Sequence, residues 1–433
     1  MDSLNNDFTT TVIGLGKIGL TIASVIAGKG IKVFGVDKNP MVVNSVNQGK
    51  CHISGEPGLE ELVMKNHYAK TLNALTDTKK AVRNSNVVIV IVPVLITADN
   101  LVDYQYIDDA VQQIGQSIKK DTLVIFETTL PTGDTRNRFG SKIEELSGLK
   151  MGTDFYLAYS PERVYSNKII KNLKDYPKVV GGVNEKSKDI AVSFYRQALE
   201  CEVIEMSSTE AAEFAKVAES VYRDVNIALA NELSVYAEEK GVNILEIIKA
   251  SNSQPFSHIH NPGIGVGGHC IPIYPYFFLN YGLNSDGLVN KAREINDSMA
   301  AYSVGLLEEE LGDLDSKNIL ILGLSFRGNV KEHTKSITLR LKEILHERNA
   351  KVVVNDPFYT SKEVNDMGVQ YKSLNEDSVR DIDVVILQAN HSEYKGLDLS
   401  MFKNCKVFLD GRNSFNGKEI EQHGMKYIGI GAR

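Results

Sequence analysis

The stretch Thr9-Thr-Thr-Val-Ile-Gly-Leu-Gly-Lys-Ile-Gly19 joins a short apolar run to three glycines at the spacing GxGxxG. The pattern predicts a strand over Thr9–Ile13, then an apolar helix from Leu20 to Ala27. A second strand is predicted over Lys32-Val-Phe-Gly-Val-Asp37, which ends in an acid. Strand, glycine turn, helix and acid together form the complete dinucleotide-binding fingerprint, which is far more specific than a glycine turn alone.

The fingerprint gives each glycine a physical role. Gly14 permits the tight turn, Gly16 lets a pyrophosphate approach the backbone, and Gly19 lets helix and strand pack closely. The start of the helix offers free amides and the positive end of its dipole to the phosphates. Asp37 can accept hydrogen bonds from ribose hydroxyls and repels a 2′-phosphate, so NAD is expected rather than NADP. The predicted cofactor-binding residues are Gly14, Leu15, Gly16, Lys17, Ile18, Asp37, Pro93 and Thr128.

Length, charge and cysteine content limit the class of protein. A chain of 433 residues is too long for one core, so two or three domains are expected. A net charge of −7 argues against nucleic-acid and membrane-surface binding, because there is no basic excess to neutralise phosphates. The four scattered cysteines form no disulfide framework and indicate a reducing compartment. With a polar N-terminus and no apolar run long enough to span a membrane, a cytoplasmic location is expected.

Strand and helix patterns continue to alternate after the fingerprint. Asn86–Val92 and Asp121–Phe126 are nearly continuous Val and Ile runs, typical of parallel strands covered on both faces. The polar segments Glu127–Gly133 and Ser160-Pro-Glu-Arg163 follow strand ends, and ligands of open α/β sheets bind at that edge. Thr128 is therefore a candidate for the nicotinamide side of the pocket, with helix capping as the alternative role.

From Ser207 the sequence pattern changes from alternating strands and helices to one long helical stretch. Ser207-Ser-Thr-Glu210 fits a capping box, and a helix is predicted from there to about Lys240. Roughly thirty residues make a helix near 45 Å long, which favours a helix that spans two domains and supplies a subunit interface. Lys216, Ser220 and Arg223 share one face of it. Polar residues on one helix face usually form a solvent-exposed stripe. Here the residues next to these three in the sequence are apolar or small, which favours a polar face that points into the protein.

The stretch Asn261-Pro-Gly-Ile-Gly-Val-Gly-Gly-His-Cys-Ile-Pro272 places four glycines ahead of Cys270. Glycines let the backbone lie close to a ligand without intervening side chains. A buried structural cysteine is one interpretation. A zinc ligand is disfavoured, because His269 adjoins Cys270 and the chain has no CxxC partner, so no metal is expected. We favour a covalent nucleophile.

A second α/β unit is predicted near the C-terminus. A helix from about Asn290 runs into the charged stretch Glu308–Lys317, which is interpreted as a linker. The following unit lacks GxGxxG, so it is expected to bind something other than a dinucleotide pyrophosphate. Arg327 and Arg412 follow strand ends and could each clamp phosphate oxygens bidentately. Its predicted elements are strands over Asn318–Gly323, Lys351–Asp356, Asp383–Leu387 and Lys406–Asp410, and a helix over Ile337–Glu347.

These pieces suggest one chemistry. With NAD as acceptor, an alcohol loses a hydride, and the thiol of Cys270 traps the aldehyde as a thiohemiacetal. A second hydride transfer then yields a thioester, which water hydrolyses to an acid. Lys216 would stabilise the oxyanions, and Glu162 would act as, or orient, the proton acceptor.

Six motifs together resemble the UDP-glucose/GDP-mannose dehydrogenase family, over essentially the whole chain and in order. The resemblance is closest to the branch that acts on UDP-N-acetylhexosamines such as UDP-N-acetylmannosamine. It implies an α/β protein with two Rossmann-like, doubly wound parallel-sheet domains, joined by a long central helix and a helical domain. The motifs are Gly14–Gly19, Glu127-Thr-Thr-Leu-Pro131, Ser160–Arg163, Tyr222–Leu233, Gly265–Pro272 and Leu409-Asp-Gly-Arg-Asn413.

The resemblance also implies an activity and an organisation. The activity is an NAD-dependent four-electron oxidation of the sugar C6 hydroxyl to a uronate, a step typical of polysaccharide biosynthesis. The organisation is a homodimer or dimer of dimers built on the long helix. The expected domains are residues 1–203 for NAD, 204–312 for the cysteine loop and the dimer interface, and 313–433 for the UDP-sugar.

By the same resemblance, Cys270 is the nucleophile, Lys216 its oxyanion partner and Glu162 the acid–base carboxylate. Thr128 corresponds to a threonine that positions cofactor and water, and Ser220 completes the implied catalytic set. The implied substrate-binding residues are Glu162, Arg163, Lys216, Arg223, His260, Gly267, Arg327 and Arg412.

Four positions depart from the family pattern. Ser220 replaces an asparagine, and Tyr274 replaces an aspartate four residues after the cysteine. Phe256 and Thr334 stand where arginines are common. Three alternatives therefore remain: a UDP-glucose 6-dehydrogenase, a two-electron dehydrogenase of the β-hydroxyacid type, and a nucleotide-sugar-binding protein without activity.

Overall fold

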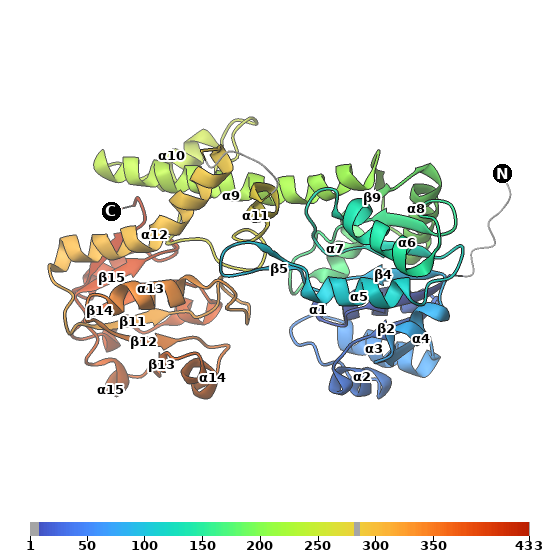
Figure 1. Ribbon diagram of the computed structural model, residues 1–433. Coiled ribbons are helices and arrows are strands. Elements are labelled where there is room, and N and C mark those ends of the chain that lie inside the picture. Colours follow the sequence, from blue (N-terminus) through green and yellow to red (C-terminus); the bar gives the residue numbers. More distant parts are fainter. Residues whose placement is uncertain (1–7, 281–285, 433) are drawn as a thin grey trace. The chain divides into compact units, whose positions relative to one another are not determined.

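A computed structural model describes residues 8–280 and 286–432 of the chain, which divide into two units (Figure 1). The first unit comprises Met1–Glu219 with Tyr276–Tyr281, and the second comprises Ser220–Pro275 with Gly282–Arg433. The N-terminal segment, whose polar sequence does not predict a signal peptide, includes residues 1–7, which lie outside the described residues. No helix in the described ranges is both long and apolar enough to span a membrane.

The fingerprint folds as the sequence predicts. Strand β1 (Thr9–Ile13) pairs in parallel with β2 (Lys32–Val36) on one side and with β4 (Val87–Val90) on the other. Helix α1 (Lys17–Gly28) begins inside the glycine motif, and most of its side chains are buried. The glycine turn therefore lies at the sheet edge where these three parallel strands end.

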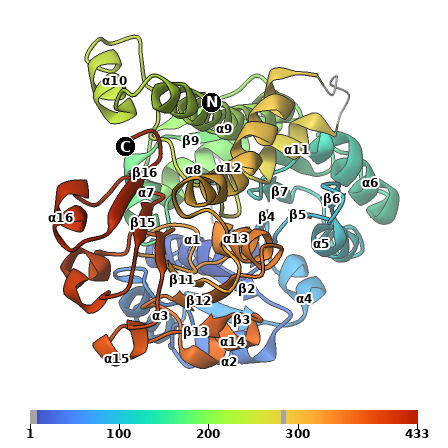
Figure 2. The same cartoon turned by 90° about the vertical axis from the view of Figure 1, so that its left-hand side faces the viewer.

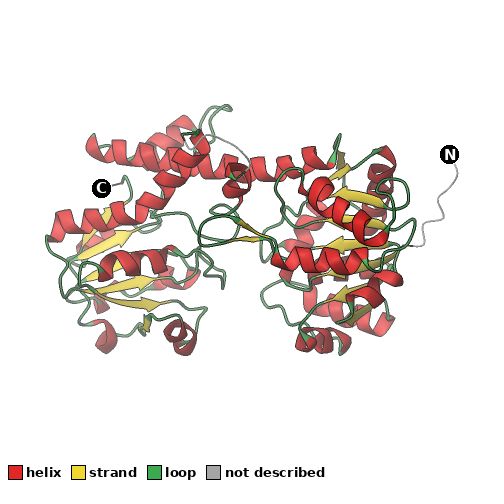
Figure 3. Ribbon diagram, viewed as in Figure 1, coloured by secondary structure: helices red, strands yellow, loops and turns green. Residues whose placement is uncertain are grey.

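In the described part of the first unit, the strands of the main sheet follow the order β10-β9-β8-β7-β4-β1-β2-β3. Every neighbouring pair is parallel except β8 and β9. Helix α1 packs beside α3, α7 and α8, whereas α5 packs beside α4 and α6, so helices cover both faces (Figure 3). The remaining elements are α2 (Pro40–Asn47), α3 (Leu59–Ala69), β3 (Leu72–Leu75), α4 (Thr78–Arg83), β5 (Leu95–Ile96), β6 (Val102–Asp103), α5 (Gln105–Gly115), β7 (Leu123–Phe126), the π-helical turn η1 (Thr135–Gly140), α6 (Ser141–Ser147), β8 (Tyr156–Tyr159), α7 (Ile169–Asp175), β9 (Lys178–Gly182), α8 (Glu185–Leu199) and β10 (Val203–Glu205).

The predicted long helix is present as α9 (Thr209–Glu239), which continues from the first unit into the second. Its cap differs from the predicted capping box by one position. The Ser208 hydroxyl, not that of Ser207, accepts a hydrogen bond from the Ala211 backbone N–H at 3.2 Å. Glu210 pairs with Arg136 at 2.6 Å, because a tertiary cation competes with the local cap for this carboxylate.

Along the chain, α9 is followed by α10 (Ile244–Ser251), α11 (Tyr274–Leu279) and α12 (Leu288–Leu311). Helices α10 and α12 belong to the second unit, whereas α11 belongs to the first unit from Tyr276 onward. The linker interpretation of Glu308–Lys317 is wrong in its first half. Helix α12 continues to Leu311 because Leu306 and Leu307 are buried in the core and Glu308 pairs with Arg348 at 2.7 Å. Only residues 312–317 connect it to the next strand.

The second sheet has the strand order β13-β12-β11-β14-β15-β16 within the described residues, all in parallel (Figure 2). Side chains alternate between its two faces. Ile319 and Ile321 pack with α12 and α13, whereas Leu320 and Leu322 pack with α15 and α16 on the other face. The elements are β11 (Asn318–Leu322), α13 (Ile337–His346), β12 (Lys351–Asn355), α14 (Ser361–Asp366), β13 (Gln370–Tyr371), α15 (Glu376–Val379), β14 (Val384–Leu387), the 3-10 turns η2 (Ser392–Gly396) and η3 (Leu399–Met401), β15 (Val407–Asp410), α16 (Gly417–Gln422) and β16 (Lys426–Gly429).

The fold class predicted from the sequence, two doubly wound α/β domains with a long helix and a helical region, is confirmed. A buried polar network joins α9 to α12 within the second unit. Arg293 donates to Asp224 at 2.6 Å, and both side chains are almost fully buried. Asn296 also donates to Asp224, at 2.8 Å, and accepts from Asn231 at 2.9 Å. The two helices are therefore fixed to each other by charge as well as by apolar packing.

Replacing Arg293 by leucine is expected to lower the free energy of unfolding by about 3–5 kcal/mol, because Asp224 would remain buried without its cation. Urea denaturation measures the loss. Arg340→Leu serves as the control, because its pair with Glu343 lies on the surface and should be worth less than about 1 kcal/mol. Equal losses in the two variants would contradict the assigned importance of the buried pair.

Candidate active site

The glycine turn of the first unit leaves an open position above its backbone. Gly14 has a φ of +99°, a conformation that favours glycine, and its N–H bonds to Val36 at 2.8 Å. A Cβ on Gly19 would lie 1.9 Å from the Gly14 carbonyl oxygen, whereas one on Gly16 would have no heavy atom within 4 Å. The turn is therefore closed below by α1 and open above Gly16, which fits a dinucleotide pyrophosphate.

Side chains around the turn hold its shape. Asp37 accepts hydrogen bonds from the backbone N–H groups of Leu15 at 3.0 Å and Asn39 at 2.9 Å. This places the acid beside the turn, as the fingerprint requires. The Leu15 side chain is fully buried, so only its backbone can face a ligand. His52, which the sequence analysis did not select, bonds to the Leu15 carbonyl oxygen at 2.8 Å.

The other predicted cofactor residues lie at the same sheet edge or on the first turn of α1. The Thr128 hydroxyl donates to the Val92 carbonyl at 2.6 Å and bridges the ends of the neighbouring strands β7 and β4. Pro93 follows Val92 and is exposed. Lys17 donates to Asn167 at 3.1 Å. Ile18 is half-buried against the core.

Glu162 belongs to a cluster of charges inside the first unit. Lys178 Nζ lies 3.4 Å from Glu162 Oε2 and 3.2 Å from Glu127 Oε2. Tyr195 donates to the buried Glu127, and Glu162 accepts from the Arg163 N–H at 2.6 Å. Burial raises the pKa of Glu127, although Lys178 opposes it. Burial also opposes the charge of Lys178, but the two carboxylates outweigh it and raise its pKa.

Lys216 is buried on a face of α9 that is anchored to both strand-end segments. Glu213, three residues earlier, accepts the Thr135 N–H at 2.8 Å and the Gly133 N–H. Glu219, three residues later, lies 3.9 Å from Arg163. Residues three apart share a helix face, so Lys216 lies between the anchor of the Thr128 segment and that of the Glu162 segment. Burial raises the pKa of Glu213 to about 7.

In the second unit, the loop that ends at Cys270 is docked on two strand-end segments. The Ile264 N–H donates to the Gly411 carbonyl at 3.1 Å, and the Gly268 N–H donates to the Thr334 carbonyl at 2.8 Å. A Cβ on Gly267 would lie 2.7 Å from the Lys335 carbonyl oxygen. The glycines are therefore required by contact with neighbouring backbone.

Cys270 itself is half-buried and forms no disulfide. Its carbonyl accepts from the N–H groups of Ile273 at 3.2 Å and Tyr274 at 2.9 Å, which starts α11. The imidazole of the neighbouring His269 contacts the carboxylate of Glu332, and its interactions with the Cys270 side chain and with Glu332 raise the pKa of His269. The thiol thus lies beside an imidazole and a carboxylate.

Arg412 lies just after β15, beside the segment that holds the cysteine loop. Its guanidinium donates to the Gln388 carbonyl at 2.5 Å and to the Phe326 carbonyl at 3.1 Å. Burial lowers its pKa to about 10, so it remains a cation at neutral pH. Arg327 is half-buried, and its guanidinium lies over the Phe326 ring at 5.6 Å. Both arginines therefore lie at the carboxyl edge of the second sheet.

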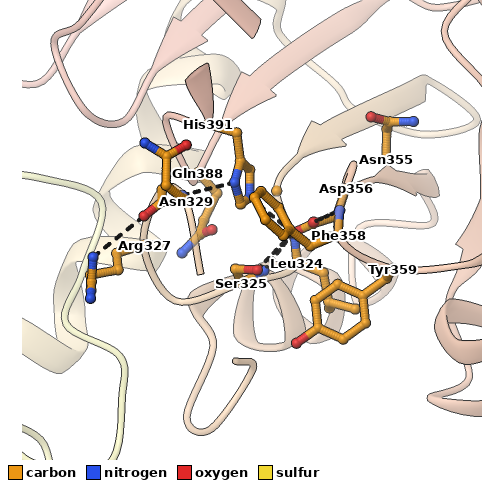
Figure 4. A network of polar contacts seen from close by, with 12 residues as sticks. Leu324, Ser325, Arg327, Asn329, Asn355, Asp356, Phe358, Tyr359, Gln388 and His391 are labelled. Carbon is orange, nitrogen blue, oxygen red and sulfur yellow. Dashed lines mark hydrogen bonds and ion pairs between the residues drawn. The ribbon is translucent and has the colours of Figure 1, made fainter. Parts of the chain in front are cut away.

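Figure 4 shows the acid that follows β12, Asp356, enclosed by a polar network. Asp356 accepts from the N–H groups of Leu324 and Ser325, each at 2.8 Å, and lies 3.1 Å from His391 Nε2. His391 Nδ1 accepts from the Asn329 N–H at 3.0 Å, so its Nε2 carries the proton and donates to Asp356. Despite burial, these donors lower the pKa of Asp356. This acid is fully engaged within the fold.

The remaining predicted residues also lie in the second unit. His260 stacks edge-on against Tyr222, and both burial and the nearby Arg223 lower its pKa. Ser220 is fully buried on α9, one turn after Lys216. Of the departures from the family pattern, Phe256 is 92% exposed.

Lys178, Glu127 and the pairing of His269 with Glu332 are not among the residues predicted from the sequence. A charged residue at the start of the apolar run Lys178-Val-Val-Gly-Gly182 is a usable signal, because a lysine is rarely buried unless it is paired. The pairing of His269 with Glu332 joins residues 63 positions apart and leaves no local pattern.

Known proteins resemble this chain along most of its length. Family models of the UDP-glucose/GDP-mannose dehydrogenase family match residues 8–199 (NAD binding domain), 210–298 (central domain) and 320–417 (UDP binding domain). The UDP-N-acetyl-D-mannosamine dehydrogenase of Pyrococcus horikoshii is 34% identical over 97% of this chain and 98% of its own. The NDP-N-acetyl-D-galactosaminuronic acid dehydrogenase of Ralstonia solanacearum is 31% identical over 96% and 98%.

Solved structures extend the likeness to three dimensions. The structure of the UDP-D-ManNAc dehydrogenase of Pyrococcus horikoshii has a TM-score of 0.90 at 33% identity, covering 98% of this chain and 99% of that one. The NDP-N-acetyl-D-galactosaminuronic acid dehydrogenase of Methanosarcina mazei has a TM-score of 0.87 at 29% identity, covering 98% and 96%. The family and the cofactor predicted from the sequence are confirmed. The chain belongs to the UDP-glucose/GDP-mannose dehydrogenase family and is an NAD-dependent dehydrogenase of that family.

Proposed function

We propose that the chain oxidises the C6 hydroxyl of a UDP-N-acetylhexosamine to the uronate, in a four-electron reaction that uses Cys270 as nucleophile. The observation that carries the proposal is the docking of the Cys270 loop on the strand end that bears Arg412, through Ile264 N–H and Gly411 O at 3.1 Å. A thiol and a half-buried arginine on one frame suit a substrate with an anionic diphosphate and an oxidisable carbon. A two-electron dehydrogenase needs neither.

UDP-N-acetylmannosamine is the first choice of sugar, since the relatives from Pyrococcus horikoshii and Campylobacter jejuni carry its name at 34% identity. UDP-N-acetylgalactosamine is the second choice, because the relatives from Ralstonia solanacearum and Methanosarcina mazei are named for the corresponding uronic acid. Arg327 and Arg412 are the proposed diphosphate ligands, and Arg163, Arg223, His260 and Gly267 complete the proposed substrate set.

The proposed residues for the first oxidation lie in the first unit. The Gly14–Gly19 turn and Asp37 would hold NAD, and two NAD molecules in succession would each accept one of the two hydrides. Glu162, kept close to the cation Lys178, receives the hydroxyl proton directly or through water that Thr128 positions. The ammonium of Lys216 stabilises oxygen as negative charge develops on it.

The second half of the proposed reaction depends on Cys270. The sulfur adds to the aldehyde carbon, and the carbonyl π electrons move to oxygen as the C–S bond forms. Loss of the second hydride and of the hydroxyl proton leaves a thioester. Water then adds, the C–S bond breaks, and the uronate departs with the thiol restored. Each sugar therefore reduces two NAD.

We also infer a homodimer or dimer of dimers that uses α9. Tyr222, Leu229 and Tyr236 recur every seven residues along this helix and are 53%, 46% and 58% exposed, which suits burial against a second helix. Three domains with bounds 1–203, 204–312 and 313–433, a cytoplasmic location and a role in polysaccharide biosynthesis stay predictions from the sequence.

The purified protein is expected to form two NADH per mole of limiting UDP-N-acetylmannosamine, because the thioester route passes two hydrides per sugar. Absorbance at the NADH band, with UDP-N-acetylgalactosamine, UDP-N-acetylglucosamine and UDP-glucose in parallel, measures the ratio. Cys270→Ala is expected to lower uronate formation by a factor of about 100 or more.

Cys51→Ala is the matched control, since Cys51 is also half-buried and lies beside Ile53 in the first unit. A ratio of one NADH per sugar would refute the four-electron reaction. Full activity of Cys270→Ala would support the β-hydroxyacid alternative, and binding of NAD without turnover of any sugar would support the non-catalytic one.

Gly16→Ala and Gly19→Ala are expected to separate cofactor binding from stability. Gly16 has open space and a φ of −66°, so alanine should leave stability unchanged but raise the Kd for NAD at least about tenfold by blocking the pyrophosphate. Gly19→Ala should cost about 1–3 kcal/mol of folding free energy through overpacking. Thermal unfolding and NAD titration test this, and equal loss of stability in both would contradict it.

Lys178→Met is expected to lower the free energy of unfolding by about 3–5 kcal/mol, because the buried carboxylate of Glu127 would lose the cation that lies 3.2 Å from it. Lys188→Met is the control, because its partners Glu185 and Glu205 lie at the surface, and it should cost less than about 1 kcal/mol. Urea denaturation measures both losses, and equal losses in the two variants would contradict the role assigned to Lys178 in the charge cluster.

A further inference from the structure

Three side chains of the second unit meet at the end of the glycine loop. His269 Nδ1 contacts the carboxylate of Glu332, and His269 immediately precedes Cys270 in the loop. His269 is about half exposed, whereas Glu332 has only a quarter of its side chain exposed. The contact therefore holds the exposed imidazole of His269 against the less exposed carboxylate of Glu332.

The backbone around these side chains fixes their spacing. The Gly268 N–H donates to the Thr334 carbonyl at 2.8 Å, next to His269 on one segment and two residues from Glu332 on the other. The Glu332 carbonyl in turn accepts the Phe326 N–H at 2.8 Å, and the Phe326 ring packs under Gly268, where a Cβ would lie 2.9 Å from it. Both segments are thus joined by backbone contacts on either side of the imidazole.

We infer that His269, oriented by Glu332, is a catalytic residue that takes the proton of Cys270 and holds the nucleophile as a thiolate. The inference deepens the proposed function and rests on it for the identity of the nucleophile. An exposed thiol has a pKa of about 8.5, so without a cationic partner only a few per cent would be thiolate at neutral pH. The imidazolium supplies that partner.

His269 and Cys270 act together both when the thiohemiacetal forms and when the thioester is hydrolysed. In the first, the thiol proton passes to the imidazole, the C–S bond forms, and the π electrons of the aldehyde move to its oxygen. In the second, water adds to the thioester, the C–S bond breaks, and the electron pair returns to sulfur beside the imidazolium. The oxidant between the halves is the NAD of the proposed reaction.

The groups that act on the ring favour its charged form. Interaction with the Cys270 side chain, followed by that with Glu332, raises the pKa of His269 to about 10, against a smaller opposing effect of burial. Lys331 of the facing segment pairs with Glu363, and Lys335 approaches the loop through its backbone carbonyl. Thiolate and carboxylate are therefore the charges that set the protonation of the imidazole.

His269 is more important in this chain because Tyr274 stands where the family pattern has an aspartate. A phenol with a pKa near 10 is a weak base at neutral pH. A thiolate that leaves easily, beside an imidazolium, lowers the demand on any base during hydrolysis. This gives the departure at Tyr274 a physical compensation within the same loop.

The test is the rate at which iodoacetamide alkylates Cys270 in the intact protein between pH 5.5 and 10, followed by mass spectrometry of the Cys270 peptide. In His269→Gln the apparent thiol pKa should rise toward about 8.5, with alkylation at pH 6.5 at least about tenfold slower and unchanged at pH 10. Glu332→Gln should shift the profile in the same direction by less. With sugar and NAD, kcat of His269→Gln should fall about tenfold at pH 7 and recover toward pH 9.

His333→Gln is the matched control, because His333 lies on the same segment and contacts Tyr359 instead. An alkylation profile of His269→Gln that superimposes on that of the unaltered protein overturns the inference, as does an equal shift in His333→Gln. Alkylation needs neither NAD nor sugar. A protein that oxidises no UDP-sugar, but whose thiol pKa depends on His269, would refute the proposed function and the catalytic role of His269, and would leave only the activation of the Cys270 thiol by His269 standing.

Discussion

Contact between two backbones governs the second unit of this protein. The glycine loop before Cys270 lies against the strand-end segments that contain Gly411 and Thr334, close enough for direct N–H to carbonyl hydrogen bonds. Side chains at Gly267 or Gly268 would collide with those segments. Because the contact excludes side chains, the thiol, His269 and Arg412 share one rigid frame, and the proposed nucleophile and phosphate ligand are positioned together.

The two sheets show how one fold supports two kinds of site. Gly14 and Gly323 have φ values of +99° and +103°, and each donates its N–H to the strand that precedes an acid, Asp37 or Asp356. Asp37 remains half-buried beside an open turn, whereas Asp356 is sealed by His391 and two backbone N–H groups. The same position therefore suits a ribose in the first unit and stabilises the turn in the second.

The buried charged side chains of the first unit are paired with each other. Glu127 and Lys178 are nearly inaccessible to water, and each would be costly to bury alone. Together with Tyr195 they form a compact cluster, and Glu162 is its more exposed member. A carboxylate that borders such a cluster keeps a cation close by while remaining accessible to a substrate. Stability and proposed chemistry are linked through Lys178.

Two sequence features, the departure from the family pattern at Thr334 and the apparent linker after Glu308, are explained by tertiary contacts. Thr334 cannot supply a guanidinium, but its carbonyl holds the Gly268 N–H, a role that any residue can fill. The helix α12 runs through a stretch that looks like a linker, because Leu306 and Leu307 gain burial that their charged neighbours do not reveal. In both cases a tertiary contact overrides the local sequence signal.

By itself, the sequence determined the two α/β units, the dinucleotide turn, the long helix and the family, because glycine spacing, apolar periodicity and strand-end acids are local patterns. It also selected Cys270, Lys216 and Glu162 as candidates from residue type and position. Only the tertiary structure decided that Lys178 lies between Glu127 and Glu162, and that Glu332 holds His269 beside Cys270. Those contacts join residues that are distant in the chain, and their energy comes from burial and charge pairing, which no local pattern encodes.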